Sequence, residues 1–363
     1  MAEPFKNLLG KPQVEWLASR LRGAWKPFPA PAFSRAANRG LEALELKARA
    51  RHIADALEQS LPGAPAEAFG VLIALLDGPS SEAAGFTYLP VSEFLERHGP
   101  RDVESALRAN YLLTQRFTSE FCLRPLILEA WKPTSRALDA WVVDPSEHVR
   151  RLVSEGTRPR LPWGRQLPPF IADPSPVLPY LEKLKDDPSE YVRRSVANNL
   201  NDIAKDHPEV VLETAKRWLQ GASKERRRLV EHGLRTLLKR GDAGALQLIG
   251  AGASKALRTS GSLSPERVKL GERVTFTARL KNTGKTELHA VVEARVHFVK
   301  VRGTSVKPFR LGRVDLGPGE TRVVSKSMEL QHRSIRRLFA GVHEVELQVN
   351  GARTPMGRFR LEV

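Results

Sequence analysis

Cysteine is almost missing from this sequence, since Cys122 is the only one in 363 residues. A single cysteine excludes an internal disulfide and the cysteine-based zinc and iron–sulfur sites. The histidines lack the spacing of metal ligands, and the chain has no glycine-rich phosphate loop and no strand–glycine–helix unit for a dinucleotide. We therefore expect no metal and no cofactor, and we interpret Cys122 as a small buried apolar residue rather than a nucleophile.

Long hydrophobic runs are also missing. No window of the sequence approaches the roughly 20 apolar residues that are needed to span a bilayer. The segment Met1–Asn7 has no charged region followed by an apolar stretch, so we expect no secretory signal. These observations favour a cytoplasmic protein without a membrane partner.

Positive charge, by contrast, is in excess. The chain has 58 Lys and Arg against 41 Asp and Glu, a net charge of +17. Residues 258–363 alone hold 21 basic and 10 acidic side chains, and residues 1–257 hold 37 and 31. Such an excess indicates a polyanionic partner, with nucleic acid as the first candidate. An anionic membrane surface or a basic protein without such a partner are the alternatives.

The hydrophobic pattern changes once along the chain. Apolar residues recur at three- and four-residue spacing up to about residue 257, which predicts helices. From about residue 264 they alternate, and turn signals such as Asn350-Gly351 recur every ten to twenty residues. We predict an all-α HEAT-like repeat superhelix over 1–257 and an all-β immunoglobulin-like sandwich over 264–363. Gly250–Ser254 and Ser260–Ser262 are expected to form the linker.

An internal repeat supports the helical assignment. The segment Asp144–Val153 recurs 43 residues later as Asp187–Val196, and a weaker copy covers Ser223–Val230. Periods of about 40 residues are typical of HEAT-type helix pairs. In each of the first two copies Asp-Pro ends the preceding element, and we expect Ser146 and Ser189 to cap the helix that follows.

The second copy shows which helix face points at a ligand. Its apolar stripe, Val192, Val196, Leu200 and Ile203, must pack on neighbouring repeats. A different face carries polar residues at four-residue steps, and the repeat aligns them with counterparts in the other copies. The aligned residues are Arg151, Arg194 and Arg228, with Glu155, Asn198 and His232 beside them and Asp202 one turn further on. We interpret these arginines as phosphate contacts, the alternative being ion pairs between repeats.

The acidic residues on this face need another explanation, because Glu155 and Asp202 would repel phosphate. A positive charge on the ligand would favour them. A proline-rich loop follows the first helix and carries Arg158, Arg160 and Trp163. An aromatic side chain beside basic ones can stack on a base or sugar while the arginines hold the strand. Trp163 could instead fill the core between repeats.

At these residues the sequence resembles the AlkC branch of the bacterial DNA alkylation repair glycosylases. Three stretches carry the resemblance: Thr118–Pro125, His148–Trp163 and Val192–Asp202. The order of helical repeats and an immunoglobulin-like domain is also similar to this branch, whereas the AlkD branch lacks the β domain. The resemblance implies a bacterial monomer that acts at the nucleoid and binds double-stranded DNA carrying N-alkylated bases.

The resemblance further implies excision of 3-methyladenine and 3-methylcytosine by hydrolysis of the N-glycosidic bond, without deep base flipping. Such bases are cationic and leave as neutral molecules, so no general acid is needed, while the sugar becomes a cation. Carboxylates can stabilise that cation and position water. The catalytic residues would be Glu120, Glu155, Asp202 and Trp163. The alternative is a non-catalytic HEAT-repeat scaffold that binds DNA or protein.

The basic residues of the β domain suggest a second contact with DNA. The segment Lys300–Gly303 and the group Arg333, Arg336 and Arg337 lie in expected loops. We predict that this domain closes on the duplex as a clamp. The alternative is a cap on the apolar edge of the last helical repeat.

Overall fold

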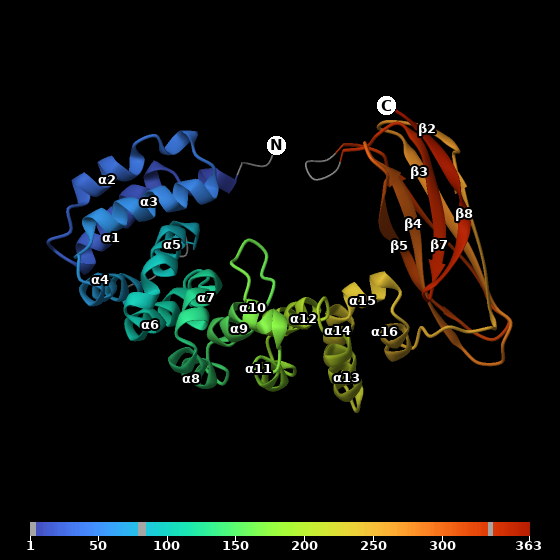
Figure 1. Cartoon of the computed structure of the whole chain (residues 1–363), viewed down its shortest axis with the longest axis horizontal. Coiled ribbons are helices and arrows are strands. Elements are labelled where there is room, and N and C mark those ends of the chain that lie inside the picture. The colour runs from blue at the N-terminus through green and yellow to red at the C-terminus, as the bar shows by residue number, and fades with distance from the viewer. Residues whose placement is uncertain (1–4, 79–84, 333–336) are drawn as a thin grey trace. The chain divides into compact units, whose positions relative to one another are not determined.

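The computed structural model describes residues 5–78, 85–332 and 337–363, and Figure 1 shows helices followed by strands. The predicted fold class, helical repeats and then an immunoglobulin-like sandwich, is confirmed. The helices of the first half are α1 (Lys11–Ala24), α2 (Ala30–Asn38), α3 (Leu46–Ser60), α4 (Pro65–Asp77), α5 (Leu89–His98), α6 (Val103–Thr114), α7 (Glu120–Glu129) and α8 (Trp131–Trp141). Those that follow are α9 (Glu147–Gly156), α10 (Pro168–Ala172), α11 (Leu178–Leu184), α12 (Glu190–Ile203), α13 (Pro208–Leu219), α14 (Lys224–Gly233), α15 (Arg235–Arg240) and α16 (Ala243–Leu248).

Contacts divide the chain into two compact units. The first comprises residues 1–207 and 222–233, and the second comprises residues 208–221 and 234–363. The second unit therefore contains α13, α15 and α16 as well as the strands, whereas the sequence placed the boundary where helices give way to strands. The change in hydrophobic pattern reveals the change of secondary structure but not which helices pack on which core.

One row of helices runs through the first unit. Helices α3, α5, α7, α9, α12 and α14 each contact the next in that order, as the ribbon in Figure 1 shows. The predicted stripe on α12 is buried: Val192, Val196, Leu200 and Ile203 are at most 2% exposed. Because this stripe fixes how α12 is turned, it also fixes where the remaining residues of the helix point.

The helices that follow the repeated Asp-Pro-Ser motif are not capped as we predicted. Neither Ser146 nor Ser189 makes a capping hydrogen bond through its side chain. Instead Asp144 Oδ1 accepts from the Ser146 N–H at 2.8 Å, and Asp187 Oδ1 accepts from the Ser189 N–H at 2.9 Å. The expectation of serine caps was wrong because the aspartate two residues earlier closes the turn through its own carboxylate.

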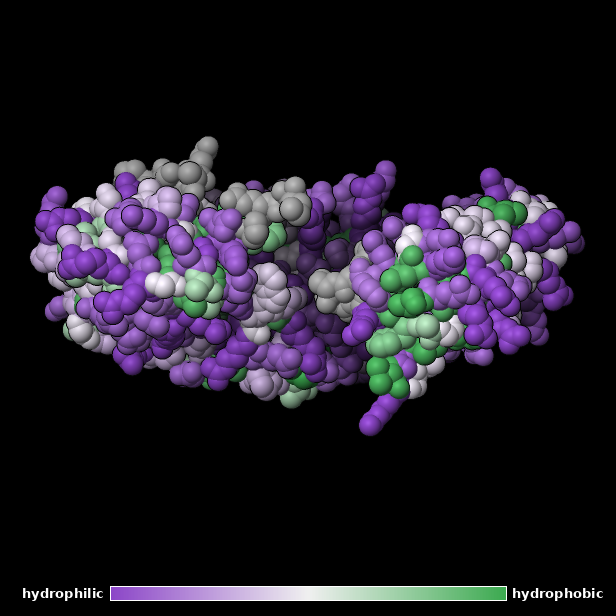
Figure 2. Space-filling view, turned by 90° about the horizontal axis from the view of Figure 1, so that it is seen from above, coloured by the Kyte–Doolittle hydropathy of each residue, from purple (hydrophilic) through white to green (hydrophobic). Residues whose placement is uncertain are grey.

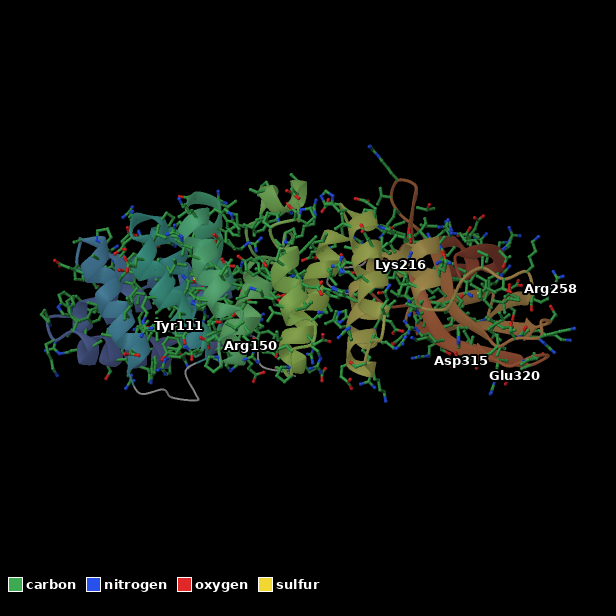
Figure 3. All side chains as sticks on the ribbon, turned by 90° about the horizontal axis from the view of Figure 1, so that it is seen from below. Tyr111, Arg150, Lys216, Arg258, Asp315 and Glu320 are labelled. Carbon is green, nitrogen blue, oxygen red and sulfur yellow. The ribbon has the colours of Figure 1, made fainter. Side chains whose placement is uncertain are left out.

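The same aspartates join neighbouring helices. The Arg150 guanidinium donates to both carboxylate oxygens of Asp187, at 2.6 and 3.0 Å. It also donates to the Asp144 carbonyl at 2.8 Å, and the Tyr111 hydroxyl donates to Asp144 Oδ2 at 3.1 Å. Figure 3 shows Tyr111 and Arg150 on neighbouring helices of this unit. The repeated Asp and first Arg therefore hold the helical array together.

The second unit is built on two sheets. Its strands are β1 (Leu257–Ser264), β2 (Arg267–Lys269), β3 (Arg273–Asn282), β4 (Leu288–Val299), β5 (Thr304–Leu316), β6 (Thr321–Glu329), β7 (Gly341–Val349) and β8 (Ala352–Glu362). One sheet has the order β1-β3-β6 and the other β2-β8-β7-β4-β5. Alternate residues of β3, from Val274 to Leu280, enter the core between the sheets as predicted. Strands β5 and β6 are edge strands of the two sheets.

The expected linker at Ser260–Ser262 is wrong, because these residues lie inside β1 and pair with β3. Gly261 is there for close packing rather than flexibility: a Cβ atom at this position would lie 2.9 Å from Met356 Cε. A short Ser-Gly-Ser segment has the composition of a linker, but here it is a strand that approaches β8 closely.

Hydrophilic residues dominate the face of the molecule seen in Figure 2, and hydrophobic ones gather over the second unit. Among the described residues no single helix is long and apolar enough to cross a membrane. The pair α3 and α4 passes that test of length and composition only when joined across a bend of 118°. Within the same residues no group of His, Cys, Asp and Glu side chains is arranged to hold a metal ion.

Candidate functional site

Three carboxylates predicted to be catalytic come together on the row of helices. Glu120 begins α7, Glu155 lies at the end of α9 and Asp202 lies at the end of α12. Two arginines bridge them. Arg151 contacts Glu120 Oε2 at 3.0 Å and Glu155 Oε1 at 3.7 Å.

Arg158 continues the chain of charges: its Nη1 donates to Glu155 Oε1 at 2.6 Å and its Nε to Asp202 Oδ2 at 2.8 Å. The Lys205 ammonium then contacts Asp202 Oδ1 at 2.8 Å. The result is a line of alternating charges, which we call the carboxylate–arginine line: Glu120, Arg151, Glu155, Arg158, Asp202 and Lys205. Its charges sum to zero, which lets carboxylates persist at positions that are almost closed to water.

Hydroxyl groups complete this line. The Ser195 hydroxyl donates to Glu155 Oε2 at 2.6 Å, and the Thr118 hydroxyl donates to Glu120. The side chains of Glu120 and Glu155 are each 8% exposed, and that of Asp202 is 1% exposed. Glu120 and Glu155 can therefore still be reached from the surface, whereas Asp202 is covered.

Burial raises the pKa of Glu120, and the negative charge of Glu155 raises it further. The Arg151 guanidinium lowers this pKa and so opposes both effects. Burial disfavours the charged form, so Glu120 holds a proton at a higher pH than an exposed glutamate does. If Glu120 must be ionised to stabilise a cation, it loses this ability as the pH falls through its raised pKa.

If Glu120 stabilises a sugar cation, as the resemblance implies, the pH–rate profile of base release should have an acidic limb centred above the ordinary pKa of glutamate, about 4.3. Arg151→Met removes the opposing guanidinium, so the limb should move to higher pH in this variant. Single-turnover rates measured across the acidic range test this. A limb that stays in place in Arg151→Met belongs to a group other than Glu120.

The loop after α9 is shaped by a buried arginine. Arg124 on α7 is fully buried and donates to the carbonyls of Gly156 at 3.2 Å, Arg158 at 2.9 Å and Arg165. Gly156, where this loop leaves the helix, packs closely on α7: a Cβ atom there would lie 2.6 Å from Leu123 Cδ2 and would force that buried side chain to move. These contacts give the loop one defined conformation, which determines where the residues near its tip lie.

Trp163 stands at that tip. Its side chain is 79% exposed, so the alternative that it fills the core between repeats is wrong. Its φ of 66° lies in the left-handed region, which is costly for a residue with a side chain. Strained backbone that presents an exposed aromatic ring is typical of functional sites.

Lys47 on α3 holds Trp163 in this position. Its ammonium donates to the Trp163 carbonyl at 2.7 Å and lies 5.9 Å from the centre of the Trp163 ring and 5.6 Å from that of Phe121. The contact joins residues 116 positions apart, and so fixes the loop tip to a helix at the start of the row.

If the chain releases bases, as the resemblance implies, and Trp163 stacks on DNA, Trp163→Ala should lower the rate of base release by about 5- to 100-fold, the range for losing one stacked base. Lys47→Met should cause a smaller loss, up to about tenfold, because one hydrogen bond is removed and the ring is retained. Arg51→Met, on the same helix, is the matched control and should react as the parent chain. Equal rates in Lys47→Met and the control would show that Lys47 does not position Trp163.

The basic residues predicted to contact phosphate divide into two groups. Arg158 is 6% exposed and lies between two carboxylates, so a phosphate contact does not fit its place. Arg160 donates to both carboxylate oxygens of Asp206, at 2.7 and 2.8 Å. Arg151 belongs to the carboxylate–arginine line and lies 5.2 Å from the centre of the Tyr191 ring. For Arg151 the alternative of structural pairing describes the geometry, and Arg158 and Arg160, expected to hold the strand, are likewise engaged by carboxylates.

The second group lies at the surface between α12 and α14. Arg194, Arg228 and His232 line one shallow pocket, together with Glu190 and Glu225. Arg194 contacts Glu190 at 3.1 Å, but both side chains are more than half exposed, so this pair is open to competition by phosphate. Asn198 is half-buried on α12 outside the lining. Arg194 and Arg228 thus remain predicted phosphate contacts, and Arg151 does not align with them in an open row.

In the β domain Arg337 is exposed and lies 5.8 Å from the centre of the Phe339 ring. Arg333 and Arg336 lie outside the described residues. Cys122 is buried, as interpreted, and its thiol donates to Asn110 Oδ1 at 3.2 Å. Burial raises the pKa of this thiol far above its usual range, which does not suit a nucleophile.

Sequence reasoning missed Lys47, Arg124 and Ser195. Arg124 and Ser195 lie in stretches that carry the family resemblance, but local spacing assigns no role to any of the three, because each acts on residues more than 30 positions away. Thr118 and Lys205 do have a local signal. Thr118 lies two residues before Glu120, and Lys205 lies three residues after Asp202 on the same turn of chain.

The fold and the site together define a class: a helical-repeat protein with an immunoglobulin-like domain, whose repeats carry ion-paired carboxylates beside an exposed tryptophan. Residues 258–363 match the family described as "Uncharacterised protein YhaZ, C-terminal Ig-like domain". The chain is 35% identical to the uncharacterized protein YhaZ of Bacillus subtilis (strain 168) over 310 residues, 85% of each chain.

A solved structure of Pseudomonas fluorescens alkylpurine DNA glycosylase AlkC, bound to DNA containing an abasic site analog, is similar over the whole length. The TM-score is 0.91 and the identity 32%, over 99% of this chain and 100% of that chain. The chain belongs to the family of AlkC and YhaZ, which confirms the resemblance found in the sequence.

Proposed function

We propose that this protein is a DNA glycosylase that releases cationic N-alkylated bases from duplex DNA. The AlkC relative is an alkylpurine DNA glycosylase, seen with DNA that contains an abasic site analog. The observation that carries the proposal is the pair Glu120 and Glu155, two carboxylates of the carboxylate–arginine line whose side chains each keep 8% exposure, in the same unit as the exposed Trp163. A protein that only gripped phosphates could use these carboxylates to hold Arg151 and Arg158, but it would have no reason to combine them with an exposed tryptophan.

The chemistry requires few groups. The N-glycosidic bond breaks, its electron pair goes to the base, and the base, cationic until then, leaves neutral. The deoxyribose becomes an oxocarbenium-like cation that water attacks at the anomeric carbon, with loss of one proton. Glu120 and Glu155 stabilise the cation and receive or direct the proton of the water. Trp163 packs on the sugar or base and excludes other water.

Asp202 serves differently from the other two carboxylates in this proposal. Since it is 1% exposed and contacts Arg158, it holds that guanidinium against Glu155 and acts as a positioning residue. 3-Methyladenine and 3-methylcytosine fit the proposal because both carry the positive charge that the carboxylates favour.

Incubation of the protein with N-methylated duplex DNA, followed by chromatography of the released bases, tests the function. Release of 3-methyladenine or 3-methylcytosine, together with abasic sites that are cleaved by alkali, is expected. Binding of the same DNA without any release above the uncatalysed rate would favour the non-catalytic scaffold and overturn the proposal.

The β domain acts as a clamp in this proposal, because its excess of basic residues exceeds what a soluble sandwich requires. Arg302 and Arg337 are both exposed. The double variant Arg302→Glu/Arg337→Glu should bind duplex DNA more weakly, with a log–log salt slope shallower by about 0.9 for each phosphate that is no longer neutralised. Arg279→Glu/Lys281→Glu, at two exposed positions of β3, is the charge-matched control. If the salt slope of the double variant is unchanged, Arg302 and Arg337 do not contact phosphates. The result would favour the alternative that the β domain only caps the last helical repeat.

A further inference from the structure

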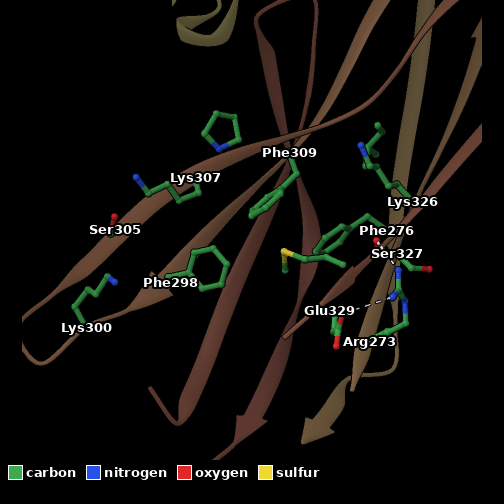
Figure 4. Close-up of a pocket in the computed structure, with 13 residues that line it drawn as sticks. Arg273, Phe276, Phe298, Lys300, Ser305, Lys307, Phe309, Lys326, Ser327 and Glu329 are labelled. Carbon is green, nitrogen blue, oxygen red and sulfur yellow. Dashed lines mark hydrogen bonds and ion pairs between the residues drawn. The ribbon is translucent and has the colours of Figure 1, made fainter. Parts of the chain in front are cut away.

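A cavity of about 650 Å³ opens in the second unit between the edge strands β5 and β6. Figure 4 shows Phe276, Phe298 and Phe309 at its centre, with charged side chains around them. Phe276 and Phe298 are each 1% exposed, and among the described residues they are the only fully buried ones of the lining. The inner wall is therefore aromatic, and Pro308, Leu311 and Met328 extend it.

The rim of this cavity is basic. Its charged residues are Arg273, Lys300, Lys307, Lys326 and Glu329. Arg273 contacts Glu329 at 4.0 Å. No carboxylate of the described residues forms an ion pair with the three lysines. Lys326 donates to the Arg310 carbonyl at 3.0 Å, and Lys300 donates to the Arg337 carbonyl at 3.5 Å.

These features select the chemistry of an occupant. An apolar group gains by leaving water for the aromatic wall. A nucleobase could stack on a ring face, but its inner edge would meet the apolar side chains of the inner wall, and the hydrogen-bonding atoms of that edge would stay unpaired. The lysines of the rim favour a negative charge at the mouth. Cavities of this size accommodate small organic ligands.

We propose that the cavity between β5 and β6 binds an anionic amphiphile, a small molecule with an apolar chain or ring system and one acidic head. The apolar part packs against Phe276, Phe298 and Phe309, and the head lies among Lys300, Lys307 and Lys326. This site is separate from the carboxylates of the helical unit and does not depend on base excision.

A fluorescence titration of the full chain with dansylaminoundecanoate tests the proposal. We expect saturable binding of one probe per chain and displacement by dodecanoate. Dodecyltrimethylammonium, with the same chain and the opposite charge, should displace it much less. Lys307→Glu and Lys326→Glu should each weaken binding by about fivefold or more, because an attractive contact becomes repulsive. Met328→Trp should abolish binding by filling the cavity.

Lys281→Glu, an exposed position on β3 outside the lining, is the control for charge alone and should bind as the parent chain does. The two rim substitutions are at exposed positions, so loss of binding in them cannot come from unfolding. The proposal is overturned if the rim variants and Lys281→Glu bind equally, or if the cationic amphiphile competes as well as dodecanoate. Displacement of the probe by single-stranded oligothymidylate but not by dodecanoate would assign the cavity to nucleic acid instead.

Discussion

Glu155→Gln should lower the rate of base release by about 10²–10³, the usual cost of removing one electrostatic stabiliser from a transition state. Glutamine keeps the size of the side chain, and its carbonyl oxygen can still accept from Arg158 while its NH2 group donates to the Ser195 hydroxyl oxygen. It carries no charge to oppose the sugar cation. Affinity for duplex DNA should hold or rise, since a negative charge near phosphates is removed. Single-turnover release of methylated bases and a binding isotherm at the same salt concentration measure the two effects.

Glu129→Gln provides the matched control, because Glu129 lies on α7 with its side chain 52% exposed, and pairs with Arg165 at 3.7 Å. Its rate should equal that of the parent chain. If Glu155→Gln loses rate and affinity by the same factor, the carboxylate supports the structure of the site rather than the reaction.

Periodic features of the sequence predicted the fold well, because they follow from burial along regular elements. The stripe from Val192 to Ile203 and the alternation from Val274 to Leu280 each report a face that must leave water. The repeated Asp-Pro-Ser segment indicated the helix pairs. The strand at Leu257–Ser264 was missed because Ser-Gly-Ser has the composition of a linker, and its packing on Met356 is a contact with distant sequence.

The sequence predicted the residues of the site that lie on helices, but not the positions of those in the loop. Spacing along a helix shows which residues share a face, so Glu155 and Asp202 were found. Spacing does not show where a loop folds back, so Arg158 was expected at phosphate and instead lies between these two carboxylates. The direction of that loop is set by Arg124, which grips three of its carbonyls, and by Lys47, which binds the Trp163 carbonyl from α3.

Arg158 should prove to be the strongest single contribution to the stability of the carboxylate–arginine line. Arg158→Met keeps most of the length of the side chain but leaves Glu155 and Asp202 without their shared cation. Removing one partner of a buried ion pair typically costs about 3–5 kcal/mol, because a buried charge loses its compensation. Asp202 keeps its contact with Lys205 and Glu155 its longer contact with Arg151, so the loss should fall at the low end of that range. Urea unfolding followed by helical circular dichroism should show this loss.

A double variant separates the loss of ion pairing by Arg158 from the loss of its side-chain packing. In Arg158→Met/Asp202→Asn one of the stranded charges is removed as well, so part of the lost stability should return, although three ion pairs are now missing: both pairs of Arg158 and the pair of Asp202 with Lys205. Arg194→Met, which breaks a pair whose side chains are 61% and 76% exposed, should cost no more than about 0.5 kcal/mol. If Arg158→Met and Arg194→Met are equally mild, water reaches Glu155 and Asp202 in solution. These carboxylates would then be solvated rather than held by Arg158, and Asp202 would have no positioning role.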